Sequence, residues 1–556
     1  MLNIILIIII VLVTLKNSQA VLTEVTNTSK GLVQGKIFKT VGEELEYSVF
    51  FGIPFAKPPV DQLRFKPPEE AEPWNGVRDA TREPNLCPQK NPFKNYTYDG
   101  DEDCLYLNLY TPKINSTDTT KRAVMIWFYA GAFVFGSISP SAYGPDFLIE
   151  EDIVVVMPNH RLGALGFLSL NHKNATGNAG LKDLVLALRW IQENIENFGG
   201  DPERVTVFGD SSGSAAVGYL VLSELATGLF HSAISMSGVP LNIWAYEPPI
   251  IAQVRVFILG LTLGIFTLDK DNLIEQLRNK SAEDIVGGTK SLLPLDVLSF
   301  APTTENPTIS TMPFLTECAL EKYKSGNFNQ VPQIIGFVDS ELMAFIAEGV
   351  QLPVINMILD GLFDLPLLRE VMNINLISSL ANWIVGKLGE LVDNTIYGVS
   401  NITSDLLLIF DVDRTQRYLT AASDVPVYYY RNSFDHQHSR HRAMGYDLDG
   451  TAHADDVHQI FWPSLPNFKL PLNDTRLTTQ RQRMVRMWSN FAKYRDPTPN
   501  GTMDPLLNIT WPPSTVAGIS LEIDTNYSIG PRPVGLLVDG LQMILNPLLG
   551  LLKGCV

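Results

Sequence analysis

The residues with the clearest capacity for chemistry are Gly209-Asp210-Ser211-Ser212-Gly213, which form a Gly-x-Ser-x-Gly pattern. An apolar run at 205–208 precedes the pattern and a helix-forming run at 215–217 follows it. A serine on a sharp turn between a strand and a helix projects its hydroxyl from the edge of a sheet, and the helix N-terminus offers N–H groups to an oxyanion. The bare pattern also arises by chance, so its flanks carry the prediction that Ser211 is a nucleophile.

The surrounding sequence predicts the elements that would position this serine. Runs that are apolar on both faces, typical of covered parallel strands, alternate with helical periodicity. The expected strands are at 123–128, 153–157, 205–208, 332–337 and 425–430, the expected helices at 181–198 and 480–492, and short antiparallel strands at 36–48 and 105–110. The pattern predicts an α/β fold with a large, mostly parallel central sheet, flanking helices and a small N-terminal antiparallel sheet.

The 556 residues show no repeat and no long linker, which favours one large domain over 21–533. Residues 1–20 read as a secretory signal, because an Ile/Leu/Val run ends in Ser18-Gln19-Ala20, and the run is short for a membrane span. The leucine-rich stretch 351–392 reads as packed helices. The apolar tail 534–556 is expected to pack on its own domain or on a partner, and a cleavable lipid-anchor signal is the less favoured alternative.

The net charge of −17 argues against nucleic acid and anionic membranes as partners. Secretion also fits the four cysteines: Cys87 and Cys104 are close enough to close a small disulfide loop, whereas Cys318 and Cys555 could pair, stay free or, for Cys555, link to another chain. It fits the ten Asn-x-Ser/Thr glycosylation sequons, which lie at Asn27, Asn95, Asn115, Asn174, Asn279, Asn401, Asn473, Asn500, Asn508 and Asn526.

Several further stretches resemble the type-B carboxylesterase/cholinesterase family, and most of all the secreted carboxylesterases of insects. They are EDCLYLNLY at 102–110, GNAGLKD at 177–183, RWIQENI at 189–195, FGGDP at 198–202 and GLFHSAISMSG at 228–238. The resemblance extends from about residue 24 to 515. It implies an α/β-hydrolase fold and hydrolysis of carboxylic esters through an acyl-enzyme intermediate, with no cofactor.

The resemblance also implies the partners of Ser211. The family order is serine, acid and then histidine. His453, in Thr451-Ala452-His453-Ala454-Asp455-Asp456, matches the family's histidine loop and would take the serine proton. Glu341 stands at the family's spacing after Gly336 and would orient the imidazole, although Leu342 replaces the glycine that usually follows; Asp339 is the rival acid.

The oxyanion hole departs from the family pattern, which places Gly-Gly-Gly after the strand. This chain has Tyr129-Ala130-Gly131-Ala132 instead. By register, the N–H groups of Gly131, Ala132 and Ser212 would bind the oxyanion. If Ala130 or Ala132 needs a positive φ, the strain costs about 1–3 kcal/mol, and we expect activity below the family norm.

The substrate is expected to be a small or lipophilic ester. The loop between Cys87 and Cys104 lacks the tryptophan with which cholinesterases bind quaternary ammonium, and Asp210 stands where juvenile-hormone esterases typically have glutamine. The alternatives are a weakly active or sequestering esterase-like scavenger and a non-enzymatic adhesion protein. The expected setting is extracellular, with no membrane span in the mature chain and oligomerisation through the tail or Cys555 left open.

The remaining histidines are expected to be structural. The segment Asp435-His436-Gln437-His438-Ser439-Arg440-His441 has close-spaced groups of the metal-binding type, but a polar loop is the favoured reading and no metal is predicted. The chain carries no phosphate loop, dinucleotide fingerprint or zinc spacing.

Overall fold

The computed structural model describes residues 21–90, 97–112, 120–289, 300–347, 400–401, 403–465, 471–499, 504–535 and 538–540. The expected signal at 1–20, the stretch 351–392, most of the tail and Cys555 lie outside these residues. Asn95, Asn115 and Asn500 lie outside them too.

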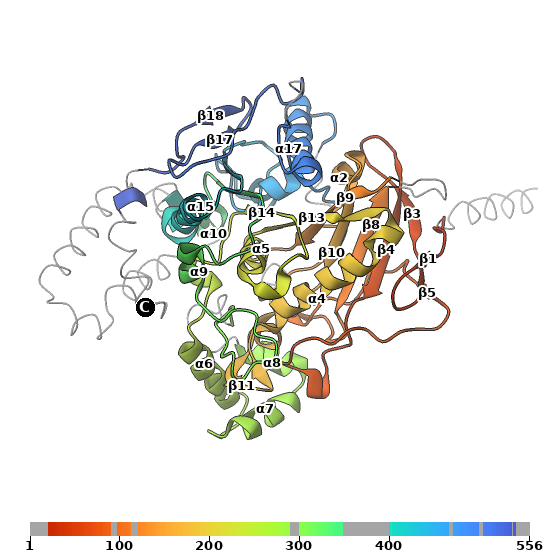
Figure 1. Ribbon diagram of the computed structural model, residues 1–556, viewed down its shortest axis with the longest axis vertical. Coiled ribbons are helices and arrows are strands. Elements are labelled where there is room, and N and C mark those ends of the chain that lie inside the picture. Colours follow the sequence, from red (N-terminus) through yellow and green to blue (C-terminus); the bar gives the residue numbers. More distant parts are fainter. Residues whose placement is uncertain are drawn as a thin grey trace, which may run out of the picture.

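A twisted eleven-stranded sheet forms the centre of the molecule (Figure 1). Its order is β18 (Ser528–Gly530), β17 (Ser520–Ile523), β16 (Val427–Asn432), β15 (Gln333–Val338), β14 (Ser232–Met236), β13 (Gly200–Asp210), β9 (Arg122–Phe128), β10 (Val154–Pro158), β8 (Tyr106–Pro112), β4 (Glu46–Pro54) and β3 (Lys36–Lys39). The strands from β10 to β17 are parallel, and β3, β4, β8 and β18 complete the two edges in antiparallel pairings.

Helices cover both faces of this sheet, as the α/β pattern predicts. On one face lie α4 (Ala179–Asn194), α5 (Ser212–Leu222), α9 (Ala319–Ser325) and α15 (Phe410–Ala422), and on the other α2 (Asp146–Glu150) and α17 (Thr475–Tyr494). Away from the sheet lie α3 (Gly163–Phe167), α6 (Pro249–Thr262), α7 (Lys270–Arg278) and α8 (Ala282–Gly288), while α10 (Met343–Ala347) and α16 (Arg440–Ala443) are short.

The central strands are buried on both faces because their apolar runs lie under these helices. Every residue of β10 and of β14 is buried, as are 123–128 of β9. Trp127 packs between Phe208 and Phe461, with ring centroids 4.9 and 4.7 Å away, and so joins two strands to the loop that follows His453. The α/β-hydrolase fold that the sequence implied is present.

The predicted elements lie where expected, with one difference in how they are joined. The antiparallel strands expected at 36–48 and 105–110 are present as β3, β4 and β8, but they extend the central sheet. The small separate N-terminal sheet consists of β1 (Thr26–Asn27), β2 (Leu32–Gln34) and β5 (Val77–Asp79), in which only β1 and β2 are antiparallel. Two-stranded sheets pair β6 (Gln89–Lys90) with β7 (Tyr98–Asp99) and β11 (Ser169–His172) with β12 (Ala175–Thr176).

The disulfide expected from spacing joins Cys87 to Cys104, and both residues are buried. Cys318, the residue before α9, is also buried, and it is disulfide-bonded rather than free, whereas Cys555 is not among the described residues. Within the part of the chain described here, no helix has the length and apolar character needed to cross a membrane.

Candidate active site

The sheet brings four loops together at the carboxyl ends of neighbouring parallel strands. The segment 129–133 follows β9, Ser211 follows β13, Glu341 follows β15, and the loop with His453 follows β16. Carboxyl ends of adjacent parallel strands meet at one edge of a sheet, which is where ligands bind in folds of this kind. The residues that the sequence singled out are therefore neighbours because of strand order.

Ser211 occupies the sharp turn between β13 and α5. Its backbone has φ 58° and ψ −121°, a conformation that an L-residue rarely adopts. Its N–H donates to the Met236 carbonyl at 2.9 Å. A Cβ at Gly213 would lie 2.0 Å from the Phe128 carbonyl oxygen, so the second glycine of the pattern is needed for α5 to approach β9. Because α5 begins at Ser212, the first N–H groups of the helix face the serine without intrahelical partners.

Glu341 and His453 face each other across the loops after β15 and β16. His453 Nδ1 lies 2.6 Å from Glu341 Oε2, and the His453 N–H donates to the Glu341 carbonyl at 3.1 Å. Glu341 is fully buried, and its Oε1 accepts the Val338 N–H at 3.0 Å. Because a carboxylate can only accept hydrogen bonds, His453 Nδ1 must carry the proton and donate it to Glu341. Nε2 then remains the basic nitrogen.

Asp339, the rival acid, has a different partner. Its Oδ1 accepts the Thr451 N–H at 2.9 Å, and the Ser340 N–H donates to the Thr451 carbonyl at 3.1 Å. Ser340 and Ala452 form an isolated parallel bridge. Asp339 thus holds the backbone of the histidine loop and leaves the imidazole to Glu341.

The segment after β9 contains positive φ angles of the kind that the sequence analysis considered for its alanines. Gly131 has φ 131°, and Ala132 and Phe133 have φ 53° and 62°. A Cβ at Gly131 would lie 1.9 Å from the Phe135 carbonyl oxygen, whereas Ala132 fits at the strain cost of a left-handed residue, about 1–2 kcal/mol. The glycine that remains in this segment is thus the one that sterics demand.

Gln89, which the sequence analysis did not single out, attaches this segment to the disulfide loop. Its side-chain amide accepts the Gly136 N–H at 2.9 Å and donates to the Gly136 carbonyl at 2.8 Å. It also donates to the Cys87 carbonyl at 3.0 Å. In the sequence, this contact is indicated only by the position of Gln89 two residues after Cys87.

Three fully buried carboxyl groups surround His453, namely Asp210, Glu341 and Asp456. Neither oxygen of Asp210 has a hydrogen-bond partner among the described residues, and Asp456 Oδ1 has none there either. Burial raises the pKa of Asp210, an effect that the charge of His453 opposes. Burial lowers the pKa of His453, but the charges of Asp210 and Glu341 outweigh it, and its pKa lies above the ordinary value. The buried position of Asp456 near His453 was not predicted, because it depends on how the side chain packs in the fold.

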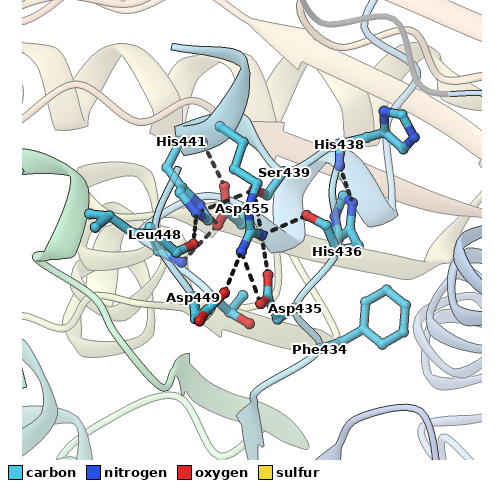
Figure 2. Close-up of polar contacts among 12 residues, drawn as sticks. Phe434, Asp435, His436, His438, Ser439, His441, Leu448, Asp449 and Asp455 are labelled. Atoms are coloured by element: carbon cyan, nitrogen blue, oxygen red, sulfur yellow. Dashed lines mark hydrogen bonds and ion pairs between the residues drawn. The ribbon is translucent and has the colours of Figure 1, made fainter. Parts of the chain in front are cut away.

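The histidine-rich segment that resembled a metal site is a network of internal contacts (Figure 2). His441 Nδ1 lies 2.7 Å from Asp455 Oδ2, and the His438 N–H donates to His436 Nδ1 at 3.2 Å. Arg442 pairs with Asp435 through both terminal guanidinium nitrogens, Nη1 and Nη2. Among the residues that the structure describes, no group of three or more His, Cys, Asp or Glu side chains is arranged to hold a metal ion.

Other histidines lie in structural contacts. His160 stacks on Tyr129 with ring centroids 4.5 Å apart, and burial lowers its pKa to about 3. Burial likewise lowers the pKa of His458 to about 3. His172 and His231 lie beside Asp271 and Glu203, at 3.2 and 3.6 Å.

Comparison with known proteins decides the family. The sequence model of the "Carboxylesterase family" matches residues 22–529, almost the whole chain. The chain belongs to the carboxylesterase family. This carboxylesterase chain is 33% identical over 496 residues to juvenile hormone esterase of Tribolium castaneum, covering 84% of this chain and 82% of the relative. Liver carboxylesterase of Sus scrofa is 32% identical over 511 residues, covering 86% of both chains.

Solved structures support the same assignment. A crystal structure of juvenile hormone esterase from Manduca sexta with OTFP covalently attached superposes with a TM-score of 0.83 at 27% identity, covering 95% of this chain and all of that one. The resemblance drawn from the sequence motifs is therefore confirmed. The protein is a carboxylic ester hydrolase, and its substrates are esters.

The oxyanion segment gives a first prediction. Gly131→Ala is expected to lower kcat for p-nitrophenyl acetate by about 10²–10³, because its Cβ would displace the Phe135 carbonyl and misalign the N–H donors. Ala132→Gly, the matched control, removes strain at φ 53° and should keep or raise kcat. Full activity in Gly131→Ala would contradict this account of the segment.

The buried carboxyl groups give a second. Asp210→Asn removes a charge that raises the pKa of His453, so the acid limb of kcat/KM should move to lower pH. Asp447→Asn, at a side chain 93% exposed, should leave that limb in place because solvent screens its charge. A pH–rate profile from pH 5 to 10 tests both; an unmoved limb in Asp210→Asn would show that Asp210 does not set the basicity of the base.

Proposed function

We propose that this chain is a secreted serine hydrolase that cleaves small or lipophilic carboxylic esters through a Ser211–Glu341–His453 triad. The observation that supports it most is the 2.6 Å contact between His453 Nδ1 and buried Glu341. It is made by the loops that follow β15 and β16, which lie two and three places from β13 in the sheet. This contact leaves His453 Nε2 as the basic nitrogen, at the edge of the sheet where Ser211 lies.

In the proposed reaction, His453 Nε2 takes the Ser211 proton as Oγ attacks the ester carbonyl carbon. The N–H groups of Gly131, Ala132 and Ser212 bind the negative oxygen of the tetrahedral intermediate. The imidazolium, stabilised by Glu341, returns the proton to the departing alcohol. Water then repeats the sequence on the acyl-enzyme, which releases the carboxylate and restores Ser211.

The surroundings of His453 favour a lipophilic leaving group. The Phe345 ring lies with its centroid 5.9 Å from that of His453 and is 37% exposed, so an apolar surface lies beside the base. An alcohol that leaves from this side would contact the phenyl ring. Burial of apolar surface contributes about 25 cal/mol per Å² to such binding.

Slow turnover of a bound acyl group is the second candidate. It is favoured by the left-handed φ of Ala132 and Phe133, next to the carbonyl-binding N–H groups. If this strain misaligns the oxyanion donors, acylation and deacylation are both slowed, and the protein sequesters lipophilic esters as well as cleaving them.

Secretion is supported by the disulfide and by the sequons. Of the seven sequon asparagines that the structure describes, six are exposed and Asn174 is half-buried. The exposed ones are Asn27, Asn279, Asn401, Asn473, Asn508 and Asn526. Each of these six could carry a glycan without disturbing the core.

The nucleophile is tested with a fluorophosphonate probe. Ser211→Ala should lose labelling and lower kcat on p-nitrophenyl esters on the order of 10⁶-fold, because no other hydroxyl replaces Oγ. Ser212→Ala, one residue away, keeps its backbone N–H and should still be labelled. Equal labelling of Ser211→Ala and the parent would refute the assignment.

The acid is tested by a pair of amide substitutions. Glu341→Gln should lower kcat by about 10²–10⁴, because an amide that donates to Nδ1 would hold the wrong tautomer. Asp339→Asn keeps an oxygen that can accept the Thr451 N–H, so its kcat should stay near the parent value. The reverse result, with Asp339→Asn the impaired variant, would assign the acid to Asp339.

A further inference from the structure

A second histidine–carboxylate pair lies in the same loop as His453 and outside the triad. His441, the second residue of α16, and Asp455 are each 1% exposed, and His441 Nδ1 lies 2.7 Å from Asp455 Oδ2 (Figure 2). On its other side, His441 Nε2 lies 2.9 Å from the Leu448 carbonyl oxygen. The Ser439 hydroxyl is farther away, at 3.4 Å from Nε2.

The partners of His441 decide its protonation. A carbonyl oxygen can only accept, and Asp455 is an acceptor as well because its two oxygens receive the N–H groups of His441 and Ala452, at 3.2 and 2.7 Å. Either neutral tautomer would therefore direct a nitrogen lone pair at an oxygen less than 3 Å away. Both nitrogens donate only in the imidazolium.

The groups around the pair agree with that state. Burial lowers the pKa of His441, but the hydrogen bond and charge of Asp455, with the Leu448 carbonyl, outweigh burial and leave the pKa above its ordinary value. Arg442 opposes the charge, and Asp435 favours it. His436, His458 and Asp456 face Asp455 from the rest of the loop and from the turn after His453.

The His441–Asp455 pair is connected to His453 through hydrogen bonds between Asp455 and the backbone of Ala452. Asp455 Oδ2 accepts the Ala452 N–H, and the Asp455 N–H returns to the Ala452 carbonyl at 3.0 Å. His453 lies between Ala452 and Asp455, followed by Ala454 with φ 66°. The carboxylate that binds His441 thus also closes the turn that presents the His453 ring.

We propose that His441 is a positioning residue for ester hydrolysis, acting as a buried imidazolium that fixes Asp455 and, through it, the turn that carries His453. This inference rests on the proposed role of His453 as the base. The imidazolium makes no contact with substrate and transfers no proton. It supplies a donor at each of its two ring nitrogens, which a neutral imidazole cannot.

The proposal has a pH dependence of definite sign. Because the pKa of His441 is raised in the fold, the stabilisation from its charge is fully present below pH about 6.5 and is lost as the pH rises through that raised pKa. Deprotonation turns one of the two hydrogen bonds into a contact between lone pairs. We therefore expect kcat to fall on the alkaline side with the titration of His441.

The experiment compares pH profiles of kcat and of the rate of fluorophosphonate labelling. His441→Gln should lower both rates about 10–100-fold through misplacement of His453, and should lose the alkaline limb because glutamine does not titrate. Asp455→Asn should move the limb to lower pH. His441→Lys, which keeps a cation with several donors, should recover part of the rate and move the limb to higher pH.

The matched control is His438→Gln, an exposed histidine three residues away, which should leave rate and profile unchanged. Should His441→Gln fail to fold, ¹⁵N NMR of the histidine-labelled parent at pH 6, below the ordinary histidine pKa, decides the point, because His441 must show two protonated ring nitrogens. One unprotonated nitrogen, or parent rates with an intact alkaline limb in His441→Gln, would overturn the inference. If the parent itself is not labelled at Ser211, the proposed function fails instead.

Discussion

At Ser211 the chain passes from β13 into α5 with φ 58° and ψ −121°, and a serine held there costs about 1–3 kcal/mol. The neighbouring parallel strands supply the restraint. Asp210 pairs with Met236, the Ser211 N–H continues that ladder, and a Cβ at Gly238 would lie 2.2 Å from the Ser211 carbonyl oxygen. A sheet buried on both faces keeps the turn from relaxing. In the proposed site, Glu341, His453 and the N–H donors can act only if this turn holds Ser211 in place.

Two histidines in one loop show how a single neighbour sets the role of an imidazole. His441 and His453 each have a buried carboxylate near Nδ1, at 2.7 and 2.6 Å. The difference lies at the other nitrogen, where His441 meets a backbone carbonyl at 2.9 Å, whereas the proposed triad requires His453 Nε2 to accept the Ser211 proton. The partners of the first ring favour its charged form. The second ring has no such carbonyl assigned to its other nitrogen in the proposed triad, where it would have to gain and lose a proton as a general base.

Much of this arrangement was predictable from local sequence. The alternation of apolar runs with helical periodicity predicted the order of strands and helices, and the glycine-flanked serine predicted the turn, because both depend on residues close in sequence. The choice between Glu341 and Asp339 came from family spacing, since both acids follow the same strand; only the coordinates show that Asp339 accepts the Thr451 N–H. The roles of Asp456, Gln89 and His441 were not predictable, because they depend on burial and on contacts made after the sheet assembles.

The hydrogen bonds between Gln89 and Gly136 connect the Cys87–Cys104 disulfide to the segment after β9. The loop that Cys87 and Cys104 close is joined by the Gln89 side-chain amide, through both its donor and its acceptor, to Gly136 in the segment after β9, which also holds the proposed oxyanion donors. A chain whose two thiols stay reduced would lack the crosslink behind this contact. Oxidation of Cys87 and Cys104 would then affect the position of the segment after β9 as well as the stability of the fold.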